Sequence, residues 1–354
     1  MGRTGRQRIT IADVAARARV SIKTVSRVLN DSPEVRAATR QRVEDAIREL
    51  DFVADVHARR LAARRTATIG LVVPGLRNLY SYYLFDIIRG VIDRADEAGY
   101  QALIIPALRV GAEDAYVRFL REGHADGLVV LLRKENRVQV ARLGASGLPA
   151  VAIDDGLLRV GIASVTADNR GGARAAVEHL IRLGHRRIVH LAGEPGFGCT
   201  DERAAGYREA LVAAGLGDRV RVVAADHARA TGFRTTRELL GSERPPTAVF
   251  AAADDTALGA LDAVRAHGLT VGRDVAVVGF NDTRMALEAD PPLTTVHQPL
   301  PEFGRRATSL LLSQLEGDER ARRQEVLPCH LVVRNSCGAA APDPGVRYPV
   351  GTVV

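Results

Sequence analysis

The sequence predicts an α/β protein in two parts, an all-helical unit at the N-terminus followed by a two-lobed domain built on parallel sheets. Apolar residues recur at helical spacing through the first fifty positions, and from residue 68 onward short continuous apolar runs alternate with helical patterns. Alternation of this kind is typical of parallel strands that are buried on both faces. A chain of 354 residues is also longer than one ordinary domain, so it can form a small unit and a larger one.

Positive charge is concentrated near the N-terminus. Residues 1–66 contain fifteen Lys or Arg against eight Asp or Glu, whereas the other 288 residues contain 34 of each. A basic unit on a neutral body favours an anionic partner. A membrane partner is not expected, because no stretch reaches the roughly 18 consecutive apolar residues of a spanning helix and the polar N-terminus lacks a signal-peptide core.

The N-terminal unit is predicted to contain three short helices. Thr10 is placed to cap the first, with Asp13 three residues later, and Ser21 is placed to cap the second after a break at 18–20. A loop at 30–33 precedes the third. In each helix, apolar side chains follow helical spacing and can close a very small core; they are Ile11, Val14, Ala15 and Ala18, then Val25, Val28 and Leu29, then Val43, Ala46, Ile47 and Leu50.

Two short helices joined by a tight turn form a helix-turn-helix, whose second helix enters the major groove of DNA. Ile22, Lys23 and Arg27 occupy the positions that reach base edges, with donors for guanine and an apolar side chain for a thymine methyl group. Hydroxyl groups on the same helix are suited to phosphate contacts, which fix register rather than sequence; they are those of Ser21, Thr24 and Ser26. The alternative is a three-helix bundle with a solvated basic face.

The second part contains eight apolar runs bounded by turn residues, with helical stretches between most of them. The runs are 69–74, 102–106, 127–132, 150–154, 187–192, 220–225, 248–252 and 275–280. The break at 154–168 suggests two lobes with the chain crossing between them, and a ligand cleft between the lobes follows. From Gly338 on the sequence is rich in Ala, Pro and Gly without periodicity, so we expect a disordered tail.

Motifs for catalysis and for cofactors are missing from the sequence. The first apolar run is followed by Pro74 and Gly75 rather than by the GxGxxG of a dinucleotide-binding enzyme, and no Walker A, HExxH or nucleophile-elbow GxSxG sequence occurs. Cys199, Cys329 and Cys337 form no CxxC and have no histidine at metal-ligand spacing. We therefore expect no enzymatic activity, no cofactor, no metal and no disulfide, in a cytoplasmic protein.

Motifs along nearly the whole chain resemble those of the LacI/GalR family of bacterial repressors. In the N-terminal unit these are ITIADVA at 9–15 and VSIKTVSRVLN at 20–30. In the body they are DGL at 126–128, DNRGG at 168–172, EHL at 178–180, LGHRRI at 183–188, RAAGY at 203–207, ALGA at 257–260, VVGFND at 277–282 and PPLTTV at 291–296. The resemblance implies a helix-turn-helix headpiece on a body that resembles periplasmic sugar-binding proteins.

The resemblance also implies a hinge helix that forms on specific DNA and enters the minor groove. The segment DVHARRLA at 55–62 matches it, with Leu61 at the position of the intercalating leucine and Arg60 beside it near phosphate. His57 and, at the end of the second helix, Asn30 complete the expected DNA-contacting residues. A plain solvated linker is the alternative interpretation of 55–62, because such short helices are unstable alone.

Four residues of the headpiece and the hinge segment depart from the family pattern, and in the body Asn281 replaces a frequent aspartate and Ala253 a frequent asparagine. Arg19 stands at the usual turn glycine and Arg36 at the usual capping serine, while Ala54 and Asp55 replace a proline and an asparagine or serine. If residue 19 takes a positive φ, an arginine there costs about 1 kcal/mol relative to glycine. Neither arginine removes a base-reading position.

In the body, the resemblance places three residues where relatives bind sugar hydroxyls. These are Asp154, Arg203 and Asn281, and Phe280 adjoins the last of them. Asn78 and Tyr80, which follow the first strand, can add polar or stacking contacts. Several of these polar residues have a structural role as the alternative to ligand binding. Asp168 and Asp254, for example, can be helix caps.

The whole pattern predicts a repressor that binds a pseudo-palindromic operator as a homodimer at the nucleoid and responds to a small molecule. We expect a sugar effector; a purine or another metabolite is the alternative, and a sugar-binding protein without a role on DNA is a further one. The predicted domains are a headpiece at 1–53, a hinge and linker at 54–66, an effector-binding and dimerisation domain at 67–337 and the tail at 338–354.

Overall fold

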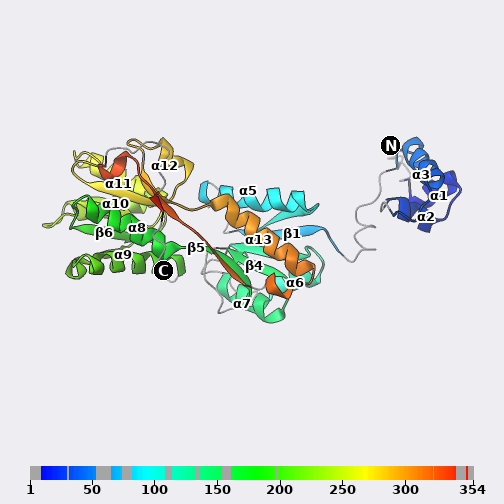
Figure 1. Ribbon diagram of the computed structural model, residues 1–354, viewed down its shortest axis with the longest axis horizontal. Coiled ribbons are helices and arrows are strands. Elements are labelled where there is room, and N and C mark those ends of the chain that lie inside the picture. The colour runs from blue at the N-terminus through cyan, green and yellow to red at the C-terminus, as the bar shows by residue number, and fades with distance from the viewer. Residues whose placement is uncertain are drawn as a thin grey trace, which may run out of the picture. The chain divides into compact units, whose positions relative to one another are not determined.

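The computed structural model separates the chain into two units, Met1–Thr66 and Ala67–Val354 (Figure 1). The structure describes residues 9–29, 32–52, 65–73, 82–107, 114–131, 136–153, 161–195, 198–321, 323–339 and 348–349. The predicted hinge helix at 55–62 lies outside these residues, and the predicted domain boundaries stay predictions.

The N-terminal unit, which we call the headpiece, contains the three predicted helices. They are α1 (Ile11–Ala18), α2 (Ile22–Leu29) and α3 (Ala37–Glu49). Thr10 caps α1 in a capping box, because its hydroxyl accepts from the Asp13 backbone while the Asp13 carboxylate accepts from the Thr10 N–H at 2.8 Å. The core is made of seven small side chains at the predicted positions; they are Val14, Ala15, Ala18, Val25, Val28, Val43 and Ala46.

The first sheet of the body is parallel throughout and has six strands. Their order is β11 (Gln324–Leu327), β5 (Ala163–Ala167), β4 (Ala150–Ile153), β3 (Gly127–Leu131), β1 (Thr68–Val73) and β2 (Gln101–Pro106). Helices α5 (Tyr82–Glu97) and α13 (Leu300–Leu315) pack against each other, as do α6 (Ala115–Arg121) and α7 (Arg137–Ser146) (Figure 1). β1, β3, β4 and β5 are buried along their whole length, as their apolar composition requires.

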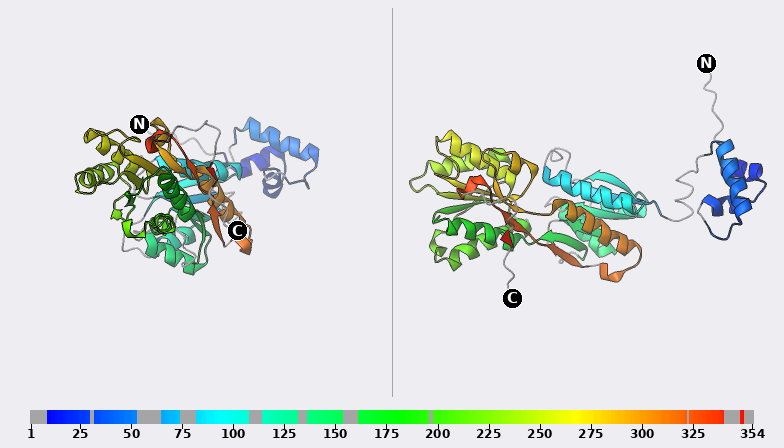
Figure 2. Two further views of the ribbon diagram at one scale, coloured as in Figure 1. Left: turned by 60° about the vertical axis from the view of Figure 1, so that its left-hand side comes forward. Right: turned by 45° about the horizontal axis from the view of Figure 1, so that its top comes forward.

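The second sheet has seven strands, of which five are parallel. Their order is β13 (Tyr348–Pro349), β12 (His330–Val332), β10 (Thr294–His297), β9 (Ala276–Asn281), β8 (Ala248–Ala251), β6 (Ile188–Ala192) and β7 (Val222–Ala224), with β12 and β13 antiparallel to their neighbours. Helices α8 (Asn169–Arg182) and α9 (Gly198–Ala213) pack together, and α10 (Arg229–Leu240) packs on α11 (Asp254–Ala266) (Figure 2). The short helix α12 (Arg284–Glu288) follows β9.

The chain passes between the two sheets three times. It leaves the first sheet after β5 to begin α8, returns after β10 to begin α13, and leaves again after β11 to begin β12. The predicted break at 154–168 therefore contains a strand, β5, which sequence analysis did not identify. The α/β class with parallel sheets is confirmed.

The structure describes residues 338–339 and 348–349 of the predicted tail. We expected disorder from Gly338 onward, whereas Tyr348–Pro349 pairs with β12 as the strand β13. Within the described part of the chain, no helix is long and apolar enough to cross a bilayer.

A neutral histidine lies in the core of the second sheet. His190 on β6 is fully buried, its ring stacks on Phe250 at 4.7 Å, and its Nδ1 donates to the Phe250 carbonyl at 3.0 Å. Because a carbonyl only accepts, the proton is on Nδ1, and Nε2 has no partner among the described residues. Burial lowers the pKa of His190 from 6.5 to about 4.

This burial predicts a loss of stability at mildly acidic pH. Since the pKa is lower in the folded state, the unfolded chain binds more protons between pH 6.5 and 4, and stability falls as the pH falls through that window. From pH 7.5 to pH 5 the contribution of His190 is ~2 kcal/mol. Urea midpoints at the two pH values should differ by less in His190→Leu than in the unchanged protein. His267→Leu, at an exposed histidine, is the matched control, and an equal pH dependence in all three proteins would contradict the prediction.

Candidate functional site

The turn between α1 and α2 has the backbone that the sequence departure suggested. Arg19 ends α1 in the left-handed conformation, with φ 52° and ψ 50°, and its N–H bonds back to the last turn of α1. The condition for the cost of an arginine at this position, a positive φ, is therefore met. Arg36, at the position of the usual capping serine, makes no side-chain cap bond to α3. Both arginines therefore add positive charge to the headpiece. Arg19 makes the end of α1 less stable than a glycine would, and Arg36 leaves the start of α3 without a side-chain cap.

Ser21 fixes the start of α2. Its hydroxyl accepts from the Thr24 N–H at 3.1 Å and contacts the Thr24 hydroxyl at 2.9 Å. Val25 and Val28 face the headpiece core, so the helix turns its other face outward. On that face Lys23 and Arg27 are exposed, and Ile22 is 52% exposed, which is unusual for an isoleucine without a partner.

Arg27 has an ion-pair partner in the loop that follows α2. Its Nη2 lies 3.2 Å from a carboxylate oxygen of Glu34, and both side chains are about half exposed. Exposed pairs of this kind contribute little to stability. The pair therefore holds the guanidinium on the outer face of α2 without removing it from solvent. Ser26, on the same helix, is half-buried.

Four predicted DNA-contacting residues lie outside the described residues. They are Asn30, His57, Arg60 and Leu61. Three predicted effector-binding residues also lie outside them; they are Asn78, Tyr80 and Asp154. Their roles stay predictions.

In the body, the structure brings together the three remaining effector candidates. Arg203 on α9 is 3% exposed, and its guanidinium carbon lies 3.9 Å from the centroid of the Phe280 ring. Its Nε donates to the Asn169 side chain at 2.8 Å, and its Nη1 donates to the Ala252 carbonyl. Asn281 follows Phe280 at the carboxyl end of β9, which is the end of parallel strands where α/β proteins bind ligands.

This group, which we call the effector cluster, contains Asn169, Arg203, Phe280, Asn281 and Gln298. Gln298 is 1% exposed and donates to the Asn281 side-chain oxygen at 3.2 Å. The Gln298 Oε1 atom has no hydrogen-bond partner among the described residues, and no carboxylate within them pairs with Arg203. The cluster therefore contains a buried cation without a carboxylate partner and a buried acceptor without a donor, which are groups that a polar ligand or water can satisfy.

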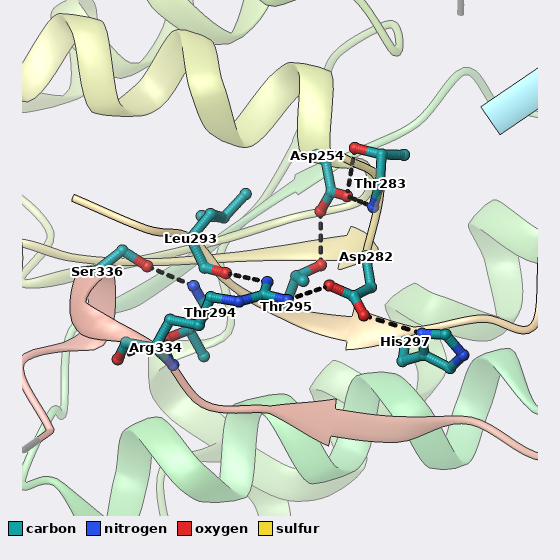
Figure 3. Close-up of polar contacts among 9 residues, drawn as sticks. All are labelled: Asp254, Asp282, Thr283, Leu293, Thr294, Thr295, His297, Arg334 and Ser336. Carbon is teal, nitrogen blue, oxygen red and sulfur yellow. Dashed lines mark hydrogen bonds and ion pairs between the residues drawn. The ribbon is translucent and has the colours of Figure 1, made fainter. Parts of the chain in front are cut away.

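A second group of polar side chains fixes the segment that carries Asn281 (Figure 3). The buried Asp254 carboxylate accepts from the Thr283 N–H at 2.7 Å, from the Thr283 hydroxyl at 3.0 Å and from the Thr295 hydroxyl at 2.5 Å. Burial raises the pKa of Asp254 from 3.8 to about 7, although these hydrogen bonds act in the opposite direction. Asp254 thus ties α11, the segment after β9 and β10 together.

Sequence analysis missed several members of these groups. Asp168 caps α8 as one alternative foresaw, since it accepts from the Gly171 N–H at 2.8 Å. Asp254 does not cap α11, because its carboxylate is used by Thr283 and Thr295 instead. Gln298 was not identified. Its available signal was a glutamine directly after an apolar and threonine-rich run, which is weak without knowledge of the sheet order.

Two family models match the chain. The model described as bacterial regulatory proteins, lacI family, matches residues 10–55, and the model of a periplasmic binding protein-like domain matches residues 177–337. Together they cover the headpiece helices and the effector cluster apart from Asn169. The chain is therefore of the class that joins a helix-turn-helix headpiece to a ligand-binding body.

Complete relatives agree with both matches. The transcriptional regulator CelR of Thermobifida fusca is 39% identical over 94% of this chain and 99% of its own length, and the lactose operon repressor of Escherichia coli is 32% identical over 93% and 90%. The solved lac repressor dimer bound to operator superposes with a TM-score of 0.84 at 31% identity, covering 94% of this chain and all of that one. The CelR–cellobiose complex gives 0.70 at 37% identity, covering 93% of this chain and all of that one.

The chain belongs to the lacI family of bacterial regulatory proteins, and the resemblance found in its sequence is confirmed. It is a DNA-binding transcriptional regulator. The outer face of α2 is accordingly the candidate DNA-reading surface.

Arg27 is predicted to read a base. Arg27→Ala should weaken the preference for the selected operator over a scrambled duplex by about 1–3 kcal/mol, because a guanidinium that bonds a guanine edge contributes that much discrimination. The operator is first selected from a random duplex library with the unchanged protein, and both affinities are measured by fluorescence anisotropy at one salt concentration. Arg42→Ala, at an exposed arginine of α3, is the matched control. Unchanged selectivity in Arg27→Ala would show that this residue does not read sequence.

Proposed function

We propose that this chain is a homodimeric repressor whose operator affinity is controlled by a small carbohydrate, and that it has no enzymatic activity. Its place of action is the cytoplasm, at the nucleoid. The observation that carries the proposal is the effector cluster: a buried Arg203 stacked on Phe280, beside Asn281, at the carboxyl ends of parallel strands.

The hydrogen-bonding groups of the cluster suit hydroxyl groups. Arg203 offers N–H donors, and Gln298 offers an unsatisfied carbonyl acceptor. A sugar hydroxyl both donates and accepts, so neighbouring hydroxyls on one ring can satisfy both kinds of group. The relative CelR has been solved with cellobiose, which makes a β-linked glucose disaccharide the first ligand to test.

A regulator controlled by a purine and a sugar-binding protein without a role on DNA are the two alternative functions. A purine or another metabolite would require a stacking surface for a flat ring, but one face of Phe280 is covered by Arg203 at 3.9 Å. A sugar-binding protein without a role on DNA would not require the exposed Ile22, Lys23 and Arg27 on α2. The cluster and the headpiece together therefore favour a sugar-responsive repressor.

The effector proposal is tested with cellobiose, lactose, cytidine and hypoxanthine in a thermal-shift screen, with and without operator. At about 100 times its dissociation constant, a ligand of the folded body adds ~2.7 kcal/mol of stability. We expect a sugar to raise the melting temperature and to change operator affinity in anisotropy titrations. Arg203→Lys should lose both responses, because an ammonium group cannot replace the planar set of N–H donors.

Arg208→Lys, at an exposed arginine of the same helix, is the matched control and should respond like the unchanged protein. Stabilisation by cytidine or hypoxanthine alone would replace the sugar with a nucleobase effector. A full sugar response in Arg203→Lys would show that the effector binds elsewhere.

A second copy of the chain is proposed to cover the β2 edge of the first sheet and the neighbouring helix α5. β2 is an edge strand, and its Leu103 and Ile104 are 43% and 42% exposed. On α5, Phe85 and Ile92 lie two turns apart and are 60% and 43% exposed. An unpaired edge beside several exposed apolar side chains is a contact surface for another protein, and the related lac repressor is a dimer on its operator.

Disrupting this face should separate the protomers. Ile92→Glu combined with Leu103→Glu should yield a monomer in sedimentation equilibrium and weaken operator binding, because one headpiece then reaches only one half-site. Val212→Glu, at a 63% exposed valine on α9, is the matched control and should remain dimeric. A dimer that survives both substitutions on the α5 and β2 face would place the interface elsewhere.

A further inference from the structure

The segment that carries Asn281 has a strained backbone. Asn281 and Asp282 have φ angles of 121° and 58°, and among the described residues they are the only consecutive non-glycine pair with positive φ. Each such residue costs roughly 1–3 kcal/mol and persists only where surrounding contacts hold it. Asn and Asp tolerate this conformation better than other side chains do, but the pair still requires an explanation.

Contacts hold the segment on three sides. Thr283 is fixed by the Asp254 carboxylate, as described above. Gln298 donates to Asn281 twice, from its backbone N–H to the Asn281 carbonyl at 3.4 Å and from its amide to the side-chain oxygen at 3.2 Å. The third contact is made by Asp282 itself.

The Asp282 carboxylate is shared between two basic side chains (Figure 3). One oxygen lies 2.6 Å from Arg334 Nη2, and the other lies 2.9 Å from His297 Nδ1. The Asp282 and Arg334 side chains are only 15% and 16% exposed. Burial by itself would raise the pKa of Asp282, but the His297 hydrogen bond and the Arg334 charge outweigh it and hold the pKa below its usual value.

The two partners of Asp282 lie at the ends of strands of the second sheet that are joined to chain crossings. His297 is the last residue of β10, after which the chain returns to the first sheet as α13. Arg334 follows β12, which the chain enters directly from β11 of the first sheet. Arg334 is itself fixed, because it donates to the Leu293 carbonyl at 2.8 Å and its backbone N–H donates to the Thr294 hydroxyl at 2.9 Å.

We infer that Asp282 is a positioning residue, which holds Asn281 in its ligand-facing conformation and links the effector cluster to two of the three chain crossings through Arg334 and His297. The inference rests on the proposed function, in that it assigns to Asp282 the regulation of the proposed sugar site. An ion pair that only stabilised the fold could be made by a residue with ordinary backbone angles. Here the paired residue, Asp282, is itself strained and directly follows Asn281 of the effector cluster.

Asp282→Asn is the variant of choice, because asparagine keeps the shape and the tolerance for positive φ but removes the charge. In isothermal titration calorimetry, cellobiose or the sugar selected by the thermal-shift screen should bind about tenfold more weakly, within the usual range of coupling between sites. Arg334→Met should have the same effect, and the double variant should be no worse than either single one. Asp262→Asn, which breaks the exposed Arg229–Asp262 pair on α10 and α11, is the matched control and should bind like the unchanged protein.

Hydrogen exchange of the sugar-free protein supplies a readout that does not depend on the effector. Peptides spanning 279–284 and 296–300 should exchange faster in Asp282→Asn, with no change in Asp262→Asn. Unchanged sugar affinity in Asp282→Asn, or unchanged exchange in these peptides, would overturn the inference. If the unchanged protein binds none of the sugars, the sugar proposal fails, and the exchange data alone then decide whether Asp282 positions the segment.

Discussion

A buried carboxylate sets the geometry of the second sheet. Asp254 is 1% exposed, and the protein supplies it with three donors from Thr283 and Thr295. Leaving such a group without donors would cost several kcal/mol, so the segment after β9 has to stay close to α11. The same carboxylate restricts the strand itself, because a Cβ at Gly279 would lie 2.5 Å from Asp254 Oδ1. The glycine of the VVGFND motif is therefore required by packing against this carboxylate.

The effector cluster follows from that anchor. With Gly279 against Asp254 and Thr283 bonded to it, the backbone between them has only three residues in which to end the strand and turn. Phe280 is then directed into the interior, where Arg203 lies on its ring, while Asn281 and Asp282 adopt positive φ. Because Gly279 and Thr283 are both held against Asp254, the backbone between them can place the polar Asn281 at the end of β9 only with strained angles. Strained residues of this kind are found where a protein holds a ligand.

The elements that the sequence predicted well are those in which apolar side chains are buried and polar side chains are exposed. β1, β3 and β9 are continuous apolar runs, and the headpiece helices have one apolar face each. One of the strands that were missed, β10, contains polar side chains that are satisfied by distant partners. β10 contains Thr294 and Thr295, whose hydroxyl groups bond the Arg334 carbonyl and Asp254, forty-odd residues away. Hydrophobic periodicity does not predict contacts between residues that are far apart in the sequence. The roles of Asp254, Asp282 and Gln298 depend on such contacts and were therefore not predicted. Arg203, Phe280 and Asn281 were identifiable because their motifs resemble those of a family, not because of their spacing.

Two of the three crossings between the sheets reach the effector cluster directly, and the strand that follows the third crossing leads to Asp282, the neighbour of Asn281. After β5, the first residue of α8 is Asn169, which accepts from Arg203 at 2.8 Å. After β10, Gln298 bonds Asn281, and after β12, Arg334 pairs with Asp282. A ligand that orders Arg203 and Asn281 therefore acts directly on residues at two crossings, and on the third only through Asp282. A ligand can shift an equilibrium only by its difference in affinity for the two states. A site next to the crossings is therefore better placed to control the body than a site within either sheet.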